Sequence, residues 1–136
     1  MNIFIVGSKY CFDKMAPVKE ALEKAGHSIT LPSSYLDPFK ELEMSKAEDD
    51  AYMVYKQQKL HEQTERVAAN EAILVMNFEK NGQPNYIGGA TFLEVFKAWE
   101  LGKKIFFYNP LPKGMLYDEL RGMGSLVIHG DLTKII

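Results

Sequence analysis

The sequence predicts an α/β protein in which a five-stranded parallel sheet lies between two helical layers, a doubly wound α/β/α sandwich. Two observations carry this prediction. Short apolar runs alternate with helical patterns along the chain, as in parallel sheets whose helices cover both faces. The run AILVM at 72–76 is apolar throughout, as expected of a strand buried on both sides. The length of 136 residues suggests one domain, 1–136.

The first part of the chain is predicted to form a strand, a helix and a second strand. Residues 2–7 are an apolar, β-branched run that ends in glycine, which indicates a buried strand. Apolar residues recur every three or four positions over 13–25, and Gly26 marks the end of that helix. Residues 27–32 predict the second strand. The region after it is less clear, with a short helix at 39–44.

The rest of the chain continues the alternation, which gives a Rossmann- or flavodoxin-like order of elements. A long helical pattern covers 47–70, where Met53, Leu60 and Val67 repeat every seven residues. We expect this stripe to be core, and an oligomerisation surface is the other interpretation. The remaining elements are strands at 72–76, 104–108 and 125–130, helices at 90–101 and 116–121, and a long loop at 77–89.

Composition and charge limit the classes of function. The formal net charge of −2 argues against general nucleic-acid binding but permits a small anionic ligand. No apolar segment approaches the roughly 20 residues that span a bilayer, and the N-terminus lacks the basic start of a signal peptide, so we expect a cytoplasmic protein with no membrane partner. The single cysteine, Cys11, is expected to be a buried thiol, with a nucleophile as the alternative. No spacing of side chains suggests a metal, and no cofactor is expected.

Polar residues and glycines gather where the predicted strands end, which is where doubly wound sheets bind ligands. Gly7, Ser8 and Tyr10 follow the first strand, and Asn77 follows the third. Gly7 allows a tight turn, while Ser8 and nearby amides suit a phosphate or a ribose hydroxyl. A plain strand-to-helix turn is the alternative, because GSKY matches neither glycine-rich phosphate-binding pattern.

The stretch GGAT, followed by Glu94, is the second candidate. Gly88 and Gly89 let the backbone approach a ligand, and the helix that follows offers free N–H groups at its start. Thr91 and Glu94 also match the capping-box spacing, in which Thr91 caps the helix and Glu94 bonds back to it. The functional interpretation makes Glu94 a nucleophile or general base, because a carboxylate can attack an anomeric carbon.

Three aromatic residues near this helix have different expected roles. Phe96 and Trp99 are three positions apart on one helix face, and we expect them to pack on the sheet. Tyr86 lies in the polar loop before the helix. A loop aromatic can stack on a nucleobase, and plain anchoring of the loop is the alternative.

The segment LHEQTERVAANEAILVMNF…GGATFLEVFKAWELGKKIFFYNPLP, between Leu60 and Pro112, is similar to the nucleoside 2-deoxyribosyltransferase family and its deoxynucleoside-5′-monophosphate N-glycosidase relatives. The start of the chain, IFIVGSKY…LEKAGHSI, also resembles the family's first strand, loop and helix. The resemblance implies a single nucleoside 2-deoxyribosyltransferase-like domain. It also implies a homo-oligomer, a dimer or larger, whose sites a neighbouring subunit completes.

The resemblance implies that Glu94 is the nucleophile, that Ser8 and Tyr10 contact the sugar or its phosphate, and that the turn at 88–91 holds the 5′ end of the ligand. Thr64 stands where the family has an aspartate that protonates or orients the leaving base. The expected function is cleavage or transfer of the N-glycosidic bond of a nucleoside or nucleotide. The alternative, favoured by Thr64, is a non-catalytic nucleotide-binding module on the same fold.

Overall fold

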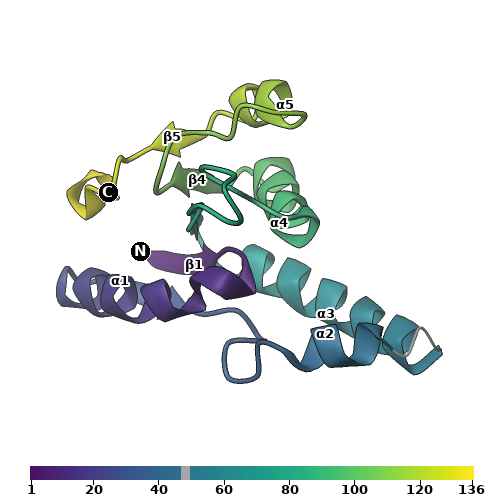
Figure 1. The fold of residues 1–136 in the computed structure, drawn as a ribbon. Helices are drawn as coiled ribbons and strands as arrows, with labels where there is room; N and C mark the ends of the chain where they lie inside the picture. The colour runs from purple at the N-terminus through teal and green to yellow at the C-terminus, as the bar shows by residue number, and fades with distance from the viewer. Residues whose placement is uncertain (47–49) are drawn as a thin grey trace.

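The computed structural model describes residues 1–46 and 50–136 of the chain, and its elements alternate as predicted (Figure 1). In chain order they are β1 (Asn2–Val6), the 3₁₀ helix η1 (Lys9–Cys11), α1 (Phe12–Lys24), β2 (Ser28–Thr30), α2 (Lys40–Ser45), α3 (Asp50–Ala69), β3 (Ala72–Val75), α4 (Gly89–Glu100), β4 (Lys104–Phe107), α5 (Tyr117–Gly122), β5 (Leu126–Val127) and the 3₁₀ helix η2 (Leu132–Lys134). Over the described residues, none of these helices is long and apolar enough to cross a membrane.

The five strands form one parallel sheet in the order β2-β1-β3-β4-β5, which confirms the doubly wound, flavodoxin-like class. Ile3 and Val6 of β1 stand opposite Ala72 and Val75 of β3. The chain leaves β1 toward β2 on one side and later adds β3 and its successors on the other. The switch in strand order therefore lies between the carboxyl ends of β1 and β3.

Alternate residues of the strands pack into two separate hydrophobic cores, because successive side chains of a strand point to opposite faces of the sheet. Ile3 and Ile5 of β1 pack with α1 and with Ile135 near the C-terminus. Phe4 and Val6 face the other way, into a core built with α3, α4 and α5. Figure 1 shows α1 on one side of the sheet and α3 and α4 on the other. The three-layer sandwich is confirmed.

The long helix α3 is only partly a core helix. Of its seven-residue stripe, Val67 is fully buried and Leu60 half-buried, whereas Met53 is 67% exposed. The core interpretation is thus correct at the C-terminal end and wrong at Met53, because α2 and the start of α3 extend past the sheet (Figure 1). The first predicted residues of this helix, 47–49, lie outside the described residues.

The prediction that Phe96 and Trp99 pack on the sheet is wrong. They are 41% and 50% exposed and contact each other, with ring centroids 5.7 Å apart. The buried face of α4 is made instead by four residues at helical spacing, Thr91, Glu94, Val95 and Ala98. Because α4 has apolar residues on both of its sides, spacing alone did not identify the inner one. The consequence is that Glu94 faces inward.

Candidate active site

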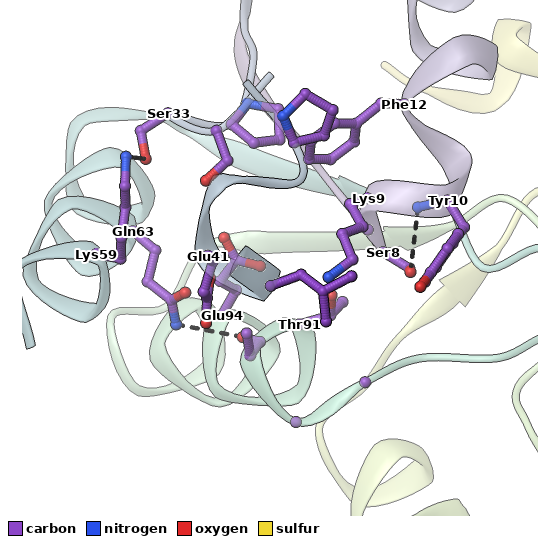
Figure 2. Close-up of a pocket in the computed structure, with 18 of the residues that line it drawn as sticks. Ser8, Lys9, Tyr10, Phe12, Ser33, Glu41, Lys59, Gln63, Thr91 and Glu94 are labelled. Carbon is purple, nitrogen blue, oxygen red and sulfur yellow. Dashed lines mark hydrogen bonds between the residues drawn. The ribbon is translucent and has the colours of Figure 1, made fainter. Parts of the chain in front are cut away.

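A cavity of about 440 Å³ opens at the carboxyl edge of the sheet, beside the end of β1. Its walls come from the loops that follow β1 and β2, from α2 and α3, and from the first turns of α4 (Figure 2). This is the edge at which doubly wound folds bind their ligands, next to the switch in strand order. The volume falls in the usual range of sites for small molecules, roughly 300–1,000 Å³.

The structure brings together all of the predicted site residues except Asn77. The cavity is lined by Gly7, Ser8, Tyr10, Gly88, Gly89, Thr91 and Glu94, and also by the loop residue Tyr86. They come from two separate segments of the chain, 7–10 and 86–94. The turn after β1 and the start of α4 therefore line one cavity.

Asn77 has a different position, outside the set of described residues that line the cavity. It is fully buried, and its Nδ2 donates to the carbonyl oxygens of Asn109, at 3.1 Å, and Pro110, at 2.9 Å. Its Oδ1 accepts a hydrogen bond from the Asn109 N–H at 2.9 Å, and the Asn109 side chain donates back to the Asn77 carbonyl at 3.0 Å. The Asn77 amide therefore ties the end of β3 to the end of β4.

The turn after β1 is fixed by a glycine and a hydroxyl. Gly7 has φ +158°, and a Cβ there would lie 3.0 Å from the carbonyl oxygen of Met76, so a larger residue would push β1 away from the end of β3. The Ser8 side chain accepts a hydrogen bond from the Tyr10 N–H at 3.4 Å and caps η1 (Figure 2). Ser8 thus has a local structural role as well as its place in the cavity wall.

The start of α4 shows that the capping-box interpretation is wrong. Gly88 is the N-cap and Gly89 the first helical residue, so Thr91 lies within the first turn and makes no side-chain cap. A Cβ on Gly89 would meet no atom of the described structure within 4 Å. No described packing contact therefore requires glycine there, and the first-turn N–H groups of α4 stand at an open wall. Gln63 Nε2 donates to the Ala90 carbonyl at 3.2 Å and joins α3 to this turn.

Glu94 is the unusual group of the site. It is 7% exposed, and its carboxyl group has no hydrogen-bond partner in the part of the chain that the structure describes. Burial raises the pKa of Glu94 from its ordinary value of 4.5 to about 8, and the positive charge of Lys56 opposes that rise. At neutral pH burial therefore keeps Glu94 mainly in its neutral form. Buried carboxyl groups with such pKa values are typical of active sites.

One wall of the cavity, which belongs to α3, is not predicted from the sequence. Its lining residues follow one another at spacings of four, three, four and three: Tyr52, Lys56, Lys59, Gln63 and Arg66. The sequence contains this periodicity. The apolar stripe of Met53, Leu60 and Val67 lies on another face of the same helix and predicts only the packing of that face. Arg66 Nε is buried and has no hydrogen-bond partner among the described residues, so an unsatisfied donor lies beside the cavity that Arg66 lines.

Basic residues predominate over acidic ones around the cavity. Its described lining contains five basic side chains and two acidic ones: Lys9, Lys56, Lys59, Arg66 and Lys80 against Glu41 and Glu94. The chain as a whole has a net charge of −2, so positive charge is concentrated here. At the rim, Lys80 Nζ lies 4.7 Å from the ring centroids of both Tyr10 and Tyr86. Cations beside aromatic rings suit a ligand that combines an anionic group with a flat base.

Two further candidates from the sequence, Thr64 and Cys11, are not part of the described cavity lining. The Thr64 hydroxyl donates to the His61 carbonyl at 2.9 Å, within its own helix, and Thr64 is not one of the described lining residues. Cys11 is 4% exposed, and burial raises the pKa of its thiol. A thiol in that state is a poor nucleophile. Cys11 belongs to the core around α1, as its default interpretation predicts.

The comparisons with known proteins add no relative. No protein-family model matches the chain, and no curated protein matches it.

Proposed function

We propose that the protein cleaves or transfers the N-glycosidic bond of a nucleoside or nucleotide, with Glu94 as the nucleophile. The observation that carries this proposal is the state of Glu94: a buried carboxyl group without a described hydrogen-bond partner, in the wall of a nucleotide-sized cavity at the carboxyl edge of the sheet. A purely structural carboxyl would be expected to have its hydrogen bonds satisfied inside the protein. Glu94 is instead available to a ligand.

In this mechanism one Glu94 oxygen attacks the anomeric carbon while the bond to the base breaks, and a covalent glycosyl ester forms. An anionic 5′ group would bind at the N-terminus of α4 and the Arg66 guanidinium, both of which line the cavity. Tyr86 stacks on the base. The chemistry needs neither a metal nor an organic cofactor, so the ligand is the nucleoside or nucleotide alone.

The raised pKa of Glu94 is compatible with this role. The nucleophile must be ionised, and burial disfavours the ionised form of Glu94. Positive charge develops at the anomeric carbon as the base departs, and that charge favours the carboxylate at the moment when it is needed. Lys56 acts in the same direction.

A non-catalytic nucleotide-binding module is the second candidate, and one observation favours it. The position of the family aspartate, Thr64, lies outside the described lining of the cavity, so no acid stands there to protonate a leaving base. In that case the neutral Glu94 carboxyl would donate a hydrogen bond to a ribose hydroxyl. Binding without base release would then be the whole function.

We also propose a homo-oligomer, because Leu93, Phe96 and Trp99 give α4 an exposed apolar stripe on the side away from its buried residues. Such a stripe suits a contact between subunits. The cytoplasmic location expected from the sequence stays a prediction.

Base release tests the proposal directly. The purified protein would be incubated with nucleosides, deoxynucleosides, their 5′-monophosphates and NAD, and free base followed by chromatography. We expect release from at least one compound by the wild type and by Glu100→Gln, an exposed glutamate of the same helix, and a loss of at least about 10³-fold in Glu94→Gln. If the wild type releases no base while one compound raises its melting temperature, the binding module replaces the enzyme.

A further inference from the structure

The cavity holds a second carboxyl group that the proposed mechanism has not used. Glu41 of α2 lines the same cavity as Glu94, and these two are the carboxyl groups of its described lining. We propose that Glu41 is the general base of the second half of the reaction, in which the glycosyl–Glu94 ester is broken. This inference rests on the proposed function, since it requires a covalent intermediate on Glu94.

The position of Glu41 is fixed by α3. Glu41 Oε1 lies 2.6 Å from Lys56 Nζ, and the two side chains are 30% and 33% exposed. Lys56 is also the residue whose positive charge acts on Glu94. A single ammonium group therefore contributes to the electrostatic environment of both carboxyl groups. Figure 2 shows Glu41 and Glu94 among the side chains that surround the cavity.

The two carboxyl groups differ in the way that a nucleophile and a base must differ. Glu94 is buried, without a described hydrogen-bond partner, and belongs to a helix packed on the sheet. Glu41 keeps access to solvent, and its ion pair with Lys56 requires the ionised form, which is the form that accepts a proton. Solvent access then lets Glu41 pass that proton to bulk water, so that it is ready for the next cycle.

The bonds and protons balance in two steps. In the first, Glu94 gives up its proton to solvent, one of its oxygens bonds to the anomeric carbon, and the carbon–nitrogen bond breaks. The electron pair of that bond leaves with the base, which takes a proton from solvent. In the second, a water oxygen bonds to the anomeric carbon and the ester bond to Glu94 breaks, with its electron pair returning to the carboxylate. Glu41 takes the proton that the water loses. In a transfer reaction, the N–H of an acceptor base replaces the water.

The test is the Glu41→Gln variant, which retains the shape of the side chain but cannot act as a base. Glu43→Gln is the matched control, because Glu43 is an exposed residue of α2 and is not part of the described cavity lining. On the compound that gives base release, we expect Glu41→Gln to release about one base per protein in a burst, and then to turn over about 10²–10⁴-fold more slowly. Mass spectrometry should find the sugar attached to Glu94.

Azide sharpens the test, because it is a nucleophile that carries no proton to remove. Adding azide to Glu41→Gln should restore turnover and give a glycosyl azide, with little effect on the wild type. Glu41→Asp keeps a carboxylate and should recover part of the turnover without azide. Its recovery separates a lost base from a damaged fold, and the melting temperature of each variant is measured alongside.

The outcomes distinguish this inference from the proposed function. Base release by Glu94→Gln, or none by the wild type, removes the proposed function whatever Glu41 does. Wild-type turnover in a folded Glu41→Gln, with Glu94→Gln inactive, overturns the role of Glu41 alone. So does the absence of a burst in Glu41→Gln, because a base of the second step leaves the first step intact. Failure of both Glu41→Asp and azide to restore turnover also overturns it.

Discussion

Two regions along the carboxyl edge of the sheet differ in whether their buried polar groups have hydrogen-bond partners within the described chain. At the ends of β3 and β4, Asn77 and Asn109 exchange hydrogen bonds between side chain and backbone, and Pro110 accepts one more. At the end of β1, where the cavity lies, Glu94 is buried without a described partner and so is Arg66 Nε. Both places follow parallel strands, and both carry polar residues.

The difference separates structure from function. A polar group whose hydrogen bonds are satisfied within the chain stabilises the fold and has little left to offer a ligand. A buried polar group without a partner lowers stability, and such groups cluster where a ligand supplies the missing partner. On this criterion we expect the edge at β3 and β4 to have a structural role, and we propose that the cavity beside β1 is the functional site.

The largest effect expected from this comparison concerns stability at Glu94. Its native pKa of about 8 lies above the ordinary 4.5, so between these values the native state binds a proton that the unfolded state has released. Stability therefore falls as pH rises through this window, by about 1.4 kcal/mol per pH unit. Glu94→Gln removes that loss. The difference in free energy of unfolding, variant minus wild type, should therefore be roughly 3 kcal/mol larger at pH 7 than at pH 4.5.

Urea unfolding at pH 4.5, 6, 7 and 8 measures this difference. Glu100→Gln serves as the control, because its exposed carboxyl group pairs only with Lys97 on the surface among the described residues. A constant difference between Glu94→Gln and the wild type across these pH values would mean that Glu94 is ionised in the native state. The contrast between the two places would then be lost.

Asn77→Ala tests the structural side of the comparison. The substitution removes three hydrogen bonds that the Asn77 side chain makes and leaves the Asn109 N–H without its acceptor. We expect a loss of roughly 2–3 kcal/mol in the free energy of unfolding, because the groups left behind are partly buried. Affinity of the folded variant for a nucleotide, measured by calorimetry, should stay within about twofold of the wild type. A large loss of affinity with normal stability would place Asn77 in the site after all.

The sequence carried enough information to predict the fold because the three central strands, β1, β3 and β4, repeat one simple pattern. The apolar runs at β1, β3 and β4 are buried on both faces, and Gly26 and Gly102 mark the ends of α1 and α4. The strand ends then place the site, since parallel strands share one carboxyl edge. For this reason the sequence predicts a candidate site at Gly7, Ser8 and Tyr10, whereas the position of Glu94 relative to Ser8 follows only from the packing of α4.

The remaining features of the site depend on tertiary packing. Both sides of α4 carry apolar residues, and nothing in the sequence decides which side faces inward. The sequence therefore predicts, wrongly, that Phe96 and Trp99 pack on the sheet. The polar stripe of α3 became part of a site only because α2 and α4 pack beside it, and Glu41 came with α2. Asn77 looked like a ligand residue because its partners, Asn109 and Pro110, lie more than thirty positions away.

Arg66 tests whether an unsatisfied donor marks the position of an anionic group. Arg66→Met keeps much of the length of the side chain and removes its donors. We expect a nucleoside 5′-monophosphate to bind about 10–100-fold more weakly, from the loss of charge-assisted hydrogen bonds worth roughly 1.5–3 kcal/mol, and the matching nucleoside to bind with little change. Calorimetry on the two ligands gives the ratio. Equal losses for both would show that Arg66 shapes the cavity without contacting a phosphate.

Tyr86 gives the smallest expected effect and the one most specific to a base. Its side chain lines the cavity, and Lys80 Nζ lies 4.7 Å from its ring centroid. Replacing Tyr86 with leucine should weaken nucleotide binding about fivefold to tenfold, from loss of stacking worth about 1 kcal/mol or slightly more, whereas phenylalanine should bind as the wild type does. Ribose 5-phosphate, which has no base to stack, should bind both variants equally. If leucine weakens ribose 5-phosphate as much as the nucleotide, Tyr86 only anchors the loop, and the flat part of the ligand must lie elsewhere in the cavity.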